Sequence, residues 1–202
     1  MAMANIDLSH RITIIGGTGD GKTTLALKLI SMIGKKYKVP AVFLNPGAEP
    51  KLYERLGEPR MDIDDTWPEF QHITPPVTPD FKKYGRIFAQ IVQHGRNLTY
   101  IDETALMAGA NIYSHWLLYL YQMGRRRKCM TVAVSQRPVA IPPFVYNQAD
   151  HIFVGDVLGN DLKRLEELTS QPWRQAIQNR EPYQFLYWSR HVKEPPKVVY
   201  LP

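Results

Sequence analysis

The sequence predicts an α/β fold with a mainly parallel central sheet, helices on both faces of that sheet, and a short C-terminal strand extension. Two observations support this prediction. Short apolar runs alternate with helical segments along the chain, as in sheets whose strands are buried on both faces. The chain has 202 residues, of which 44% are hydrophobic, enough for the core of one domain. We therefore expect a single domain over residues 1–202, with a core at about 10–170 and an extension at about 171–202.

The N-terminal part is expected to form a strand, a helix and a second strand. Ile12–Ile15 is a β-branched run that leads into glycines, which is typical of a strand followed by a loop. Lys22–Ile33 carries apolar residues at helical spacing. Gly34 is expected to end this helix. Ala41–Leu44 is the second short apolar run and hence the second strand.

The middle of the chain begins with a proline-rich stretch. Residues 51–79 are expected to be irregular, apart from one short helix near Leu52–Leu56. Phe81–His94 has a clear apolar face and is predicted to be helical. Leu98–Ile101 is predicted to be a third strand, and Ile112–Met123 a helix.

The C-terminal part continues the alternation of strands and helices. Met130–Val134 and Ile152–Val154 are predicted to be the fourth and fifth strands, and Asp161–Leu168 a short helix. Tyr183–Ser189 alternates between apolar and polar residues like a half-buried strand. The final segment, EPPKVVYLP, is expected to be an extended arm.

The composition excludes several classes of protein. No segment reaches the eighteen or so apolar residues of a membrane span, and the N-terminus lacks the apolar stretch of a signal peptide. The single cysteine, Cys129, fits a reducing intracellular setting. The six histidines are scattered without the spacing of a zinc site. The formal net charge of +6 is compatible with a polyanionic partner such as DNA.

The strongest local motif is GGTGDGKTT, which directly follows the first predicted strand. It fits the G-x-x-x-x-G-K-[ST] pattern of a phosphate-binding loop, in which glycines allow backbone N–H groups to converge on one anion. The following helix adds partial positive charge at its N-terminus. The predicted nucleotide-binding residues are Gly16, Gly17, Thr18, Gly19, Asp20, Gly21, Lys22, Thr23 and Thr24.

Individual roles follow from this motif. Lys22 is expected to reach the β- and γ-phosphates of ATP, and the Thr23 hydroxyl to ligate Mg²⁺. Asp20 is unusual because it places an acid within an anion-binding loop. We expect its side chain to point away from the phosphates, since it would otherwise weaken nucleotide binding.

An acidic pair, Asp102 and Glu103, ends the third predicted strand. An aspartate at this place in a phosphate-loop protein holds Mg²⁺, and a glutamate beside it can act as the general base that activates water. This pair therefore favours ATP hydrolysis over phosphoryl transfer to another acceptor.

The strand Met130–Val134 is expected to lie between the strand that precedes the phosphate loop and the strand that precedes the acidic pair. Gln136 at its end would then face the γ-phosphate. An amide at that position can donate to a phosphate and accept from the attacking water.

Around this strand the sequence resembles the FtsK/HerA superfamily of DNA-pumping ATPases. Gly124-Arg125 is followed, after ten residues, by Gln136-Arg137-Pro138, similar to the strand of that superfamily that begins after Gly-Arg and ends in Gln-Arg-Pro. The resemblance covers roughly residues 10–170, and IPPFVYNQADHIFVGDV and NDLKRLEEL contribute to it. Within the superfamily, the chain looks most like the packaging ATPases of tailless icosahedral viruses with internal membranes, including archaeal turreted viruses.

The resemblance implies a P-loop NTPase fold of the RecA-like (ASCE) type and a role for each matching position. Lys22, Thr23, Asp102, Glu103 and Gln136 match the nucleotide loop, the Mg²⁺ and water-activating acids and the polar sensor. Arg125 matches the arginine finger that acts on the nucleotide of a neighbouring subunit, with Arg126 or Arg127 as alternatives. A finger of this kind requires a ring, so the resemblance implies a homo-oligomer, expected to be a hexamer, with double-stranded DNA in its pore.

Contacts with DNA are expected to involve phosphate groups rather than bases. The first candidates are Lys82, Lys83 and Arg86, and the region of Arg55 and Arg60 and the segment Lys35–Lys38 are alternatives. The loop Ala105–Asn111 is small and flexible in composition and could couple the nucleotide site to the pore.

The sequence thus suggests an ATP-driven translocase of double-stranded DNA that packages a viral genome into a preformed capsid. It would act in the host cytoplasm or at the packaging vertex of the virion, with capsid-vertex or membrane proteins as candidate partners. A cellular or plasmid DNA-transfer or helicase-like motor is one alternative. A nucleotide-binding phage morphogenesis protein that does not pump DNA is another, and a small-molecule kinase is disfavoured by Glu103 and Gln136.

Overall fold

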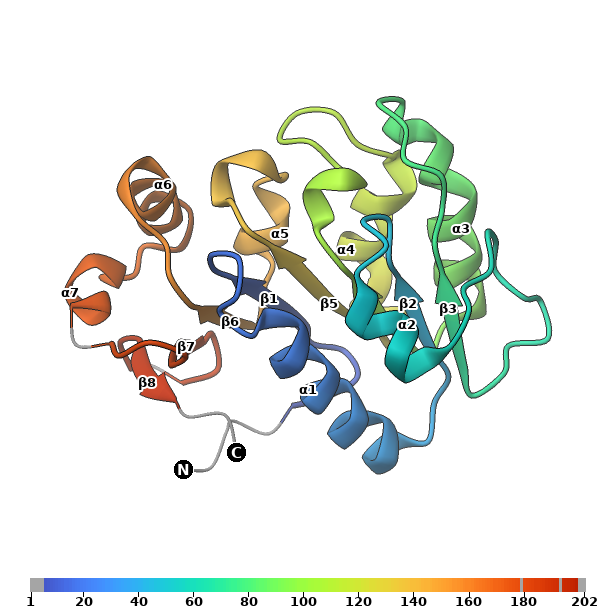
Figure 1. Ribbon diagram of the computed structural model, residues 1–202, viewed down its shortest axis with the longest axis horizontal. Helices are drawn as coiled ribbons and strands as arrows, with labels where there is room; N and C mark the ends of the chain where they lie inside the picture. The colour runs from blue at the N-terminus through green and yellow to red at the C-terminus, as the bar shows by residue number, and fades with distance from the viewer. Residues whose placement is uncertain (1–5, 179, 193, 200–202) are drawn as a thin grey trace.

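The computed structural model describes residues 6–178, 180–192 and 194–199. One eight-stranded sheet forms its centre, in the order β3-β2-β4-β5-β1-β6-β7-β8 (Figure 1). The strands are β1 (Arg11–Ile15), β2 (Ala41–Leu44), β3 (Phe70–Ile73), β4 (Asn97–Ile101), β5 (Cys129–Ser135), β6 (His151–Val154), β7 (Phe185–Ser189) and β8 (Lys197–Val199). The first six are parallel to their neighbours, and β7 and β8 are added antiparallel.

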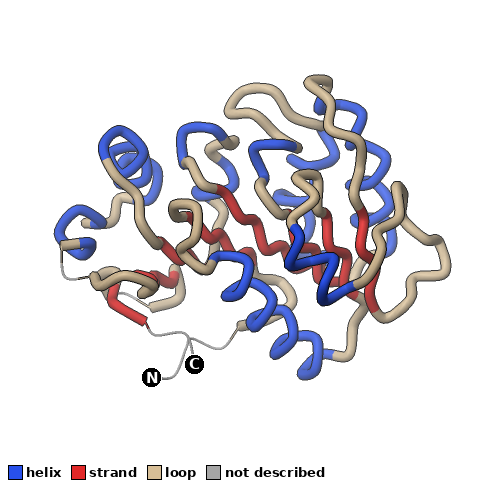
Figure 2. Tube along the Cα trace, in the orientation of Figure 1, coloured by secondary structure: helices blue, strands red, loops and turns tan. Residues whose placement is uncertain are grey.

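Helices cover both faces of the sheet, as Figure 2 shows in blue against the red strands. The α-helices are α1 (Lys22–Tyr37), α2 (Pro50–Leu56), α3 (Gly85–His94), α4 (His115–Arg127), α5 (Phe144–Asn147), α6 (Gly159–Thr169) and α7 (Trp173–Ile177), and three 3₁₀ turns are η1 (Phe81–Tyr84), η2 (Thr104–Leu106) and η3 (Pro138–Ala140). One face packs mainly against α1, and the other against α3, α4, α6 and α7. The predicted α/β fold with its mainly parallel sheet is confirmed.

Strand β5 lies at the centre of this arrangement. All seven of its residues are buried, and parallel ladders join it to β1 on one side and β4 on the other. Cys129, its first residue, is buried, and burial raises the pKa of its thiol to about 11. The placement of this strand between the strands of the phosphate loop and of the acidic pair agrees with the prediction.

The first long helix continues past the expected end. Gly34 lies within α1, and the helix ends at Lys38, whose φ of 49° is left-handed and whose N–H donates to the Gly34 carbonyl at 2.8 Å. Lys35 and Lys36 are good helix formers whose charges favour the C-terminal end of a helix. They therefore extend the helix beyond a glycine that the sequence suggested as its end.

The helix predicted at Ile112–Met123 is shifted along the chain. It begins after Ser114, whose side chain accepts a hydrogen bond from the N–H of Trp116 at 3.2 Å, a standard N-cap. It runs through Gly124, where a Cβ atom would stand 3.1 Å from the Cys129 carbonyl oxygen. Gly124 thus permits a close approach between the end of α4 and the beginning of β5, and Arg125 lies in the helix.

Other differences concern short elements. The proline-rich stretch contains β3, which adds a parallel edge strand beside β2. The helix predicted at Phe81–His94 is split into η1 and α3. Helices α5 and α7 were not predicted, and part of the expected arm forms β8, while residues 200–202 of that arm lie outside the described residues. Among the described residues, no helix has both the length and the apolar character that crossing a membrane requires.

The C-terminal extension shares the main core. Trp173 of α7 is fully buried in the same cluster as Leu165 and Leu186, and its Nε1 donates to Thr169 Oγ1 at 2.7 Å. The sheet also continues from β6 into β7 and β8 without a break. We therefore expect the extension to unfold together with the rest of the chain.

Replacing Trp173 by alanine tests this expectation. Trp173→Ala should lower the free energy of unfolding by about 3–5 kcal/mol, because it removes a buried aromatic side chain. Urea denaturation followed by circular dichroism measures the change. Tyr183→Ala is the control, since the Tyr183 side chain is 74% exposed. An unchanged midpoint for Trp173→Ala, or a separate early transition, would contradict a shared core.

Candidate functional site

The predicted site residues follow three adjacent parallel strands at the carboxyl edge of the sheet. The phosphate loop follows β1, the acidic pair follows β4, and Gln136 follows β5, which lies between them. Parallel strands end at the same edge, so the fold brings these three segments together although they are far apart in sequence. In Figure 1 the loop after β1 and the segments after β4 and β5 all lie on the upper side of the sheet.

The phosphate loop connects β1 to the N-terminus of α1. Gly19 and Gly21 have φ values of 87° and 91°, left-handed conformations that favour glycine. Gly21 directly precedes the first turn of α1, so the unpaired N–H groups of that turn face the loop. The loop therefore has the backbone geometry of an anion-binding site.

Lys22 is buried beside this loop. Its Nζ donates to the Gly17 carbonyl at 2.7 Å. Burial lowers the pKa of Lys22, and the nearby carboxylates of Glu103, Asp20, Asp102 and Glu49 oppose that effect. The lysine is thus surrounded by acidic groups from three different segments of the chain.

Asp20 joins the phosphate loop to the segment after β6. Its Oδ2 accepts a hydrogen bond from the N–H of Asp156 at 2.5 Å. The same oxygen occupies the space that a Cβ atom on Gly16 or Gly155 would need. The carboxylate is therefore packed against two glycine backbones, and neither glycine could carry a side chain without displacing it.

Asp102 is buried at the end of β4 and is held by Tyr100. The Tyr100 hydroxyl hydrogen-bonds Asp102 Oδ1 and also interacts with the side chain of Thr23. Burial raises the pKa of Asp102 to about 6, and the hydrogen bond from Tyr100 acts in the opposite direction. Tyr100 thus connects the two residues that were predicted to hold Mg²⁺.

Glu103 is fixed by the end of β5. Ser135 Oγ donates to its Oε1 at 3.1 Å, and the N–H of Gln136 donates to its Oε2 at 3.2 Å. Its backbone has a φ of 43°, a left-handed conformation that is rare for residues other than glycine. Such strained residues cluster at functional sites, and here the conformation accompanies a carboxylate held by two donors.

Gln136 reaches the phosphate loop, where its Oε1 accepts from Thr18 Oγ1 at 3.2 Å. The next residue points elsewhere: Arg137 pairs with Asp161 of α6, with 3.2 Å between Nε and Oδ2. The triplet Gln136-Arg137-Pro138 therefore combines one residue at the site with one that attaches the strand end to α6.

The three candidate finger arginines lie in the last turn of α4, at the opposite, amino edge of the sheet. Arg125 pairs with the buried Asp150 at 2.7 Å while its side chain stays 51% exposed. Arg127 donates to the carbonyls of Val92 and Gln93 at the end of α3. Arg126 is exposed and has no polar partner among the described residues. Arg125 and Arg126, but not Arg127, line a pocket of about 320 Å³.

The candidate DNA-binding residues lie in η1 and at the beginning of α3. Lys82 and Lys83 are exposed in η1, and Arg86 in α3 is 74% exposed with a 3.4 Å ion pair to Asp62. The loop predicted at Ala105–Asn111 is partly ordered, because it begins within η2 and its next two residues, Met107 and Ala108, are buried. Coupling of this segment to a pore stays a prediction.

Sequence reasoning missed several residues of the site. Tyr100 lies in β4, two positions before Asp102, which directly follows the strand. Side chains two positions apart along a strand project to the same face, and this alternation could have indicated that Tyr100 lies beside Asp102. Ser135 is the last residue of β5. Glu49 follows β2 and is held by Asn45, whose Oδ1 accepts from the Glu49 N–H at 2.7 Å. The only signal for Glu49 was its position just after β2, the strand next to β4.

Comparison with known structures identifies the fold. Neither the protein-family models nor the curated proteins gave a match to the sequence. The crystal structure of B204, the DNA-packaging ATPase from Sulfolobus turreted icosahedral virus, is similar, with a TM-score of 0.77, 17% identity and coverage of 96% of this chain and 98% of that chain. The chain has the P-loop NTPase fold.

Two further solved structures are similar to the chain and agree with this fold. The genome packaging NTPase B204 from Sulfolobus turreted icosahedral virus 2, in complex with AMPPCP, has a TM-score of 0.75 at 17% identity, covering 96% of this chain and 98% of that chain. A KaiC-like protein from Pyrococcus horikoshii has a TM-score of 0.50 at 16% identity, with coverage of 96% and 90%. The similarity to B204 thus extends over almost the full length of both chains.

Tyr100→Phe tests how the oxygens that are predicted to bind Mg²⁺ are held. The substitution removes one hydroxyl that contacts both Asp102 and Thr23, so Mg²⁺-dependent nucleotide affinity should fall about tenfold. Titration with a fluorescent ATP analogue, with and without Mg²⁺, measures the loss. Tyr84→Phe is the control, because the Tyr84 hydroxyl contacts Pro76 and Thr78 instead. Equal affinities for Tyr100→Phe and the wild type would contradict this role.

Proposed function

We propose that the protein is an ATP-driven translocase of double-stranded DNA that packages a viral genome into a preformed capsid. The observation that carries the hydrolytic part is the Glu103 carboxylate, held by Ser135 and Gln136 beside the phosphate loop. The packaging part is supported by the similarity to B204, which is described as a genome packaging NTPase and a DNA-packaging ATPase. The site of action would be the host cytoplasm or the packaging vertex, with capsid-vertex or membrane proteins as candidate partners.

The site has the donors that MgATP requires. The N–H groups of the phosphate loop and Lys22 are suited to the β- and γ-phosphates. The Thr23 hydroxyl and the Asp102 carboxylate are hard oxygen donors of the kind that Mg²⁺ prefers, and Tyr100 contacts both. Bound Mg²⁺ would neutralise charge on the phosphates.

Glu103 is suited to orient the attacking water and accept its proton. Two hydrogen bonds from the end of β5 fix its carboxylate, so the base does not need to be ordered when nucleotide binds. Gln136 contacts Thr18 of the loop and is placed to respond to loss of the γ-phosphate. We assign hydrolysis to this pair of residues.

We further propose that an arginine at the amino edge acts on the nucleotide of a neighbouring subunit in a homo-oligomeric ring, which we take to be a hexamer. Arg125 lies at the opposite end of β5 from Gln136. A strand of seven residues is about 23 Å long, so Arg125 is far from the nucleotide site of its own chain. Arg126 is the alternative, because it is exposed in the same pocket. Arg127 is not a candidate, since it binds the end of α3.

Substitution of the base and of the finger tests this mechanism. Glu103→Gln should lower ATP turnover by about 10²–10⁴-fold, the usual contribution of a general base. Arg125→Ala or Arg126→Ala should lower it by about 10³–10⁵-fold, whichever is the finger. Mixed rings of Glu103→Gln with the inactive arginine variant should recover activity, because some shared sites then have both groups.

Arg127→Ala is the matched control for this experiment. It removes an adjacent arginine of the same helix turn, so its turnover in intact oligomers should stay near that of the wild type. Wild-type turnover in Glu103→Gln would contradict the assigned base. Failure of the mixed rings to recover would contradict a site shared between subunits.

The proposed DNA contacts are tested by salt dependence. When the logarithm of the DNA-binding constant is plotted against the logarithm of the salt concentration, each phosphate contact contributes about 0.9 to the slope. Lys82→Ala with Lys83→Ala should therefore reduce that slope for duplex DNA by about 2. Lys35→Ala with Lys38→Ala is the control, because these lysines lie at the end of α1, at the opposite edge of the sheet. A reduction in the control pair alone would place the contacts there instead.

A further inference from the structure

Three histidines meet at the amino edge of the sheet, away from the nucleotide site. His10 precedes β1, His151 begins β6, and His191 follows β7. Strand β7 is antiparallel to β6 and pairs Ser189 with His151, so its end lies beside the beginning of β6. The topology therefore gathers histidines whose spacing in the sequence gives no sign of a common site.

The ring nitrogens are close enough to share one ion. Each of the three rings offers a nitrogen, and these atoms lie within 4.8 Å of one another; among the described residues, this is the one such group of three or more histidine, cysteine or acidic residues. His10 Nδ1 and His151 Nε2 are hydrogen-bonded at 2.9 Å, and His10 Nδ1 also accepts from the N–H of Asp7 at 3.2 Å, so an ion would replace both hydrogen bonds. Two nitrogens bound to one Zn²⁺ at 2.0–2.1 Å in a tetrahedron are about 3.3 Å apart, so this pair is already near the required spacing.

The third ring must rotate to complete the site. His191 is stacked on His10, with 4.4 Å between the ring centroids and an interplanar angle of 17°. An ion lies in the plane of each ring that binds it, so two parallel rings cannot both point at it. The His191 side chain is 41% exposed in the turn after β7. It therefore has room for the rotation.

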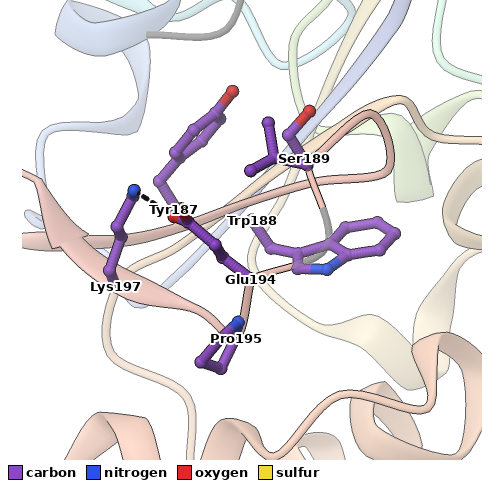
Figure 3. A pocket seen from close by; sticks show the side chains of 7 residues that line it. Tyr187, Trp188, Ser189, Glu194, Pro195 and Lys197 are labelled. Carbon is purple, nitrogen blue, oxygen red and sulfur yellow. Dashed lines mark hydrogen bonds and ion pairs between the residues drawn. The ribbon is translucent and has the colours of Figure 1, made fainter. Parts of the chain in front are cut away.

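Two neighbouring groups are suited to orient the ligands. The Tyr187 hydroxyl is 3.0 Å from His151 Nδ1, which leaves Nε2 for an ion. Figure 3 shows Tyr187 projecting from β7 on the side opposite Trp188. His191 Nε2 is 3.1 Å from Asp150 Oδ1, which leaves Nδ1. Metal-binding histidines are commonly held in this way, by a hydroxyl or carboxylate at the other ring nitrogen.

Charged groups around the three histidines both favour and oppose the binding of a cation. Asp150 is fully buried and supplies negative charge, but it also pairs with Arg125 at 2.7 Å and Arg11 at 3.8 Å. These arginines reduce the attraction for a cation, so the affinity should be lower than at a structural zinc site.

We propose that His10, His151 and His191 form a binding site for a transition-metal ion of the zinc class, with water or a group from a partner as the fourth ligand. Imidazole nitrogens suit Zn²⁺, Co²⁺ and Ni²⁺, whereas Mg²⁺ prefers oxygen. The site is separate from the nucleotide site. His191 shares Asp150 Oδ1 with Arg125.

Binding of Co²⁺ to the full-length protein without an affinity tag tests this proposal. Excess Mg²⁺ is present throughout to occupy the acidic residues of the nucleotide site. One equivalent of Co²⁺ should give the intense visible absorption of a tetrahedral nitrogen-ligated ion, and Zn²⁺ should displace it. The double variant His10→Gln, His191→Gln should lose at least about tenfold in affinity, since even groups behind the ligands contribute that much.

His115→Gln is the control, because His115 begins α4 outside the cluster and should leave the spectrum unchanged. The double variant keeps the buried His151. The circular dichroism spectrum of the double variant should therefore match that of the wild type. Absence of the visible bands from the wild type would overturn the proposal. Bands of full intensity and unchanged affinity in the double variant would also overturn it.

Discussion

The arrangement of the molecule depends on the parallel ladders that hold β5 between β1 and β4. These ladders place the phosphate loop, the acidic pair and Gln136 on one edge of the sheet. They also explain why all seven residues of β5 are buried, since both faces of a central strand are covered by helices. Ser135 at the end of the strand then holds Glu103, so the backbone pairing fixes the acid as well as the strand.

The two ends of β5 are anchored in different ways. At the carboxyl end, Arg137 pairs with Asp161, and Asp161 also accepts from the N–H of Val139 at 3.2 Å. At the amino end, Arg127 binds the last carbonyls of α3, and Gly124 lets α4 approach Cys129 closely. Movement of the strand relative to α3, α4 or α6 would therefore break charged or tightly packed contacts.

The sequence predicted the features that depend on local chemistry. The glycines and Lys22 of the phosphate loop, the acidic pair and the apolar central strands were readable because each leaves a pattern within about ten residues. Strand β3 was missed because it lies in a proline-rich stretch, and its pairing with β2 is long-range. The Ser114 cap was overlooked, which displaced the predicted start of α4. The histidines could not be grouped, because only the antiparallel β7 brings His191 next to His151.

The acids around Lys22 have a consequence for the stability of the protein without bound cation. Asp102, Glu103, Glu49 and Asp20 all affect a single lysine. The pKa of Asp102 is raised from 3.8 to about 6, so keeping it ionised at neutral pH costs on the order of 3 kcal/mol. The cost is present above the folded pKa and disappears below the unfolded one. A divalent cation bound to Asp102 as proposed would offset this cost and so raise the free energy of unfolding.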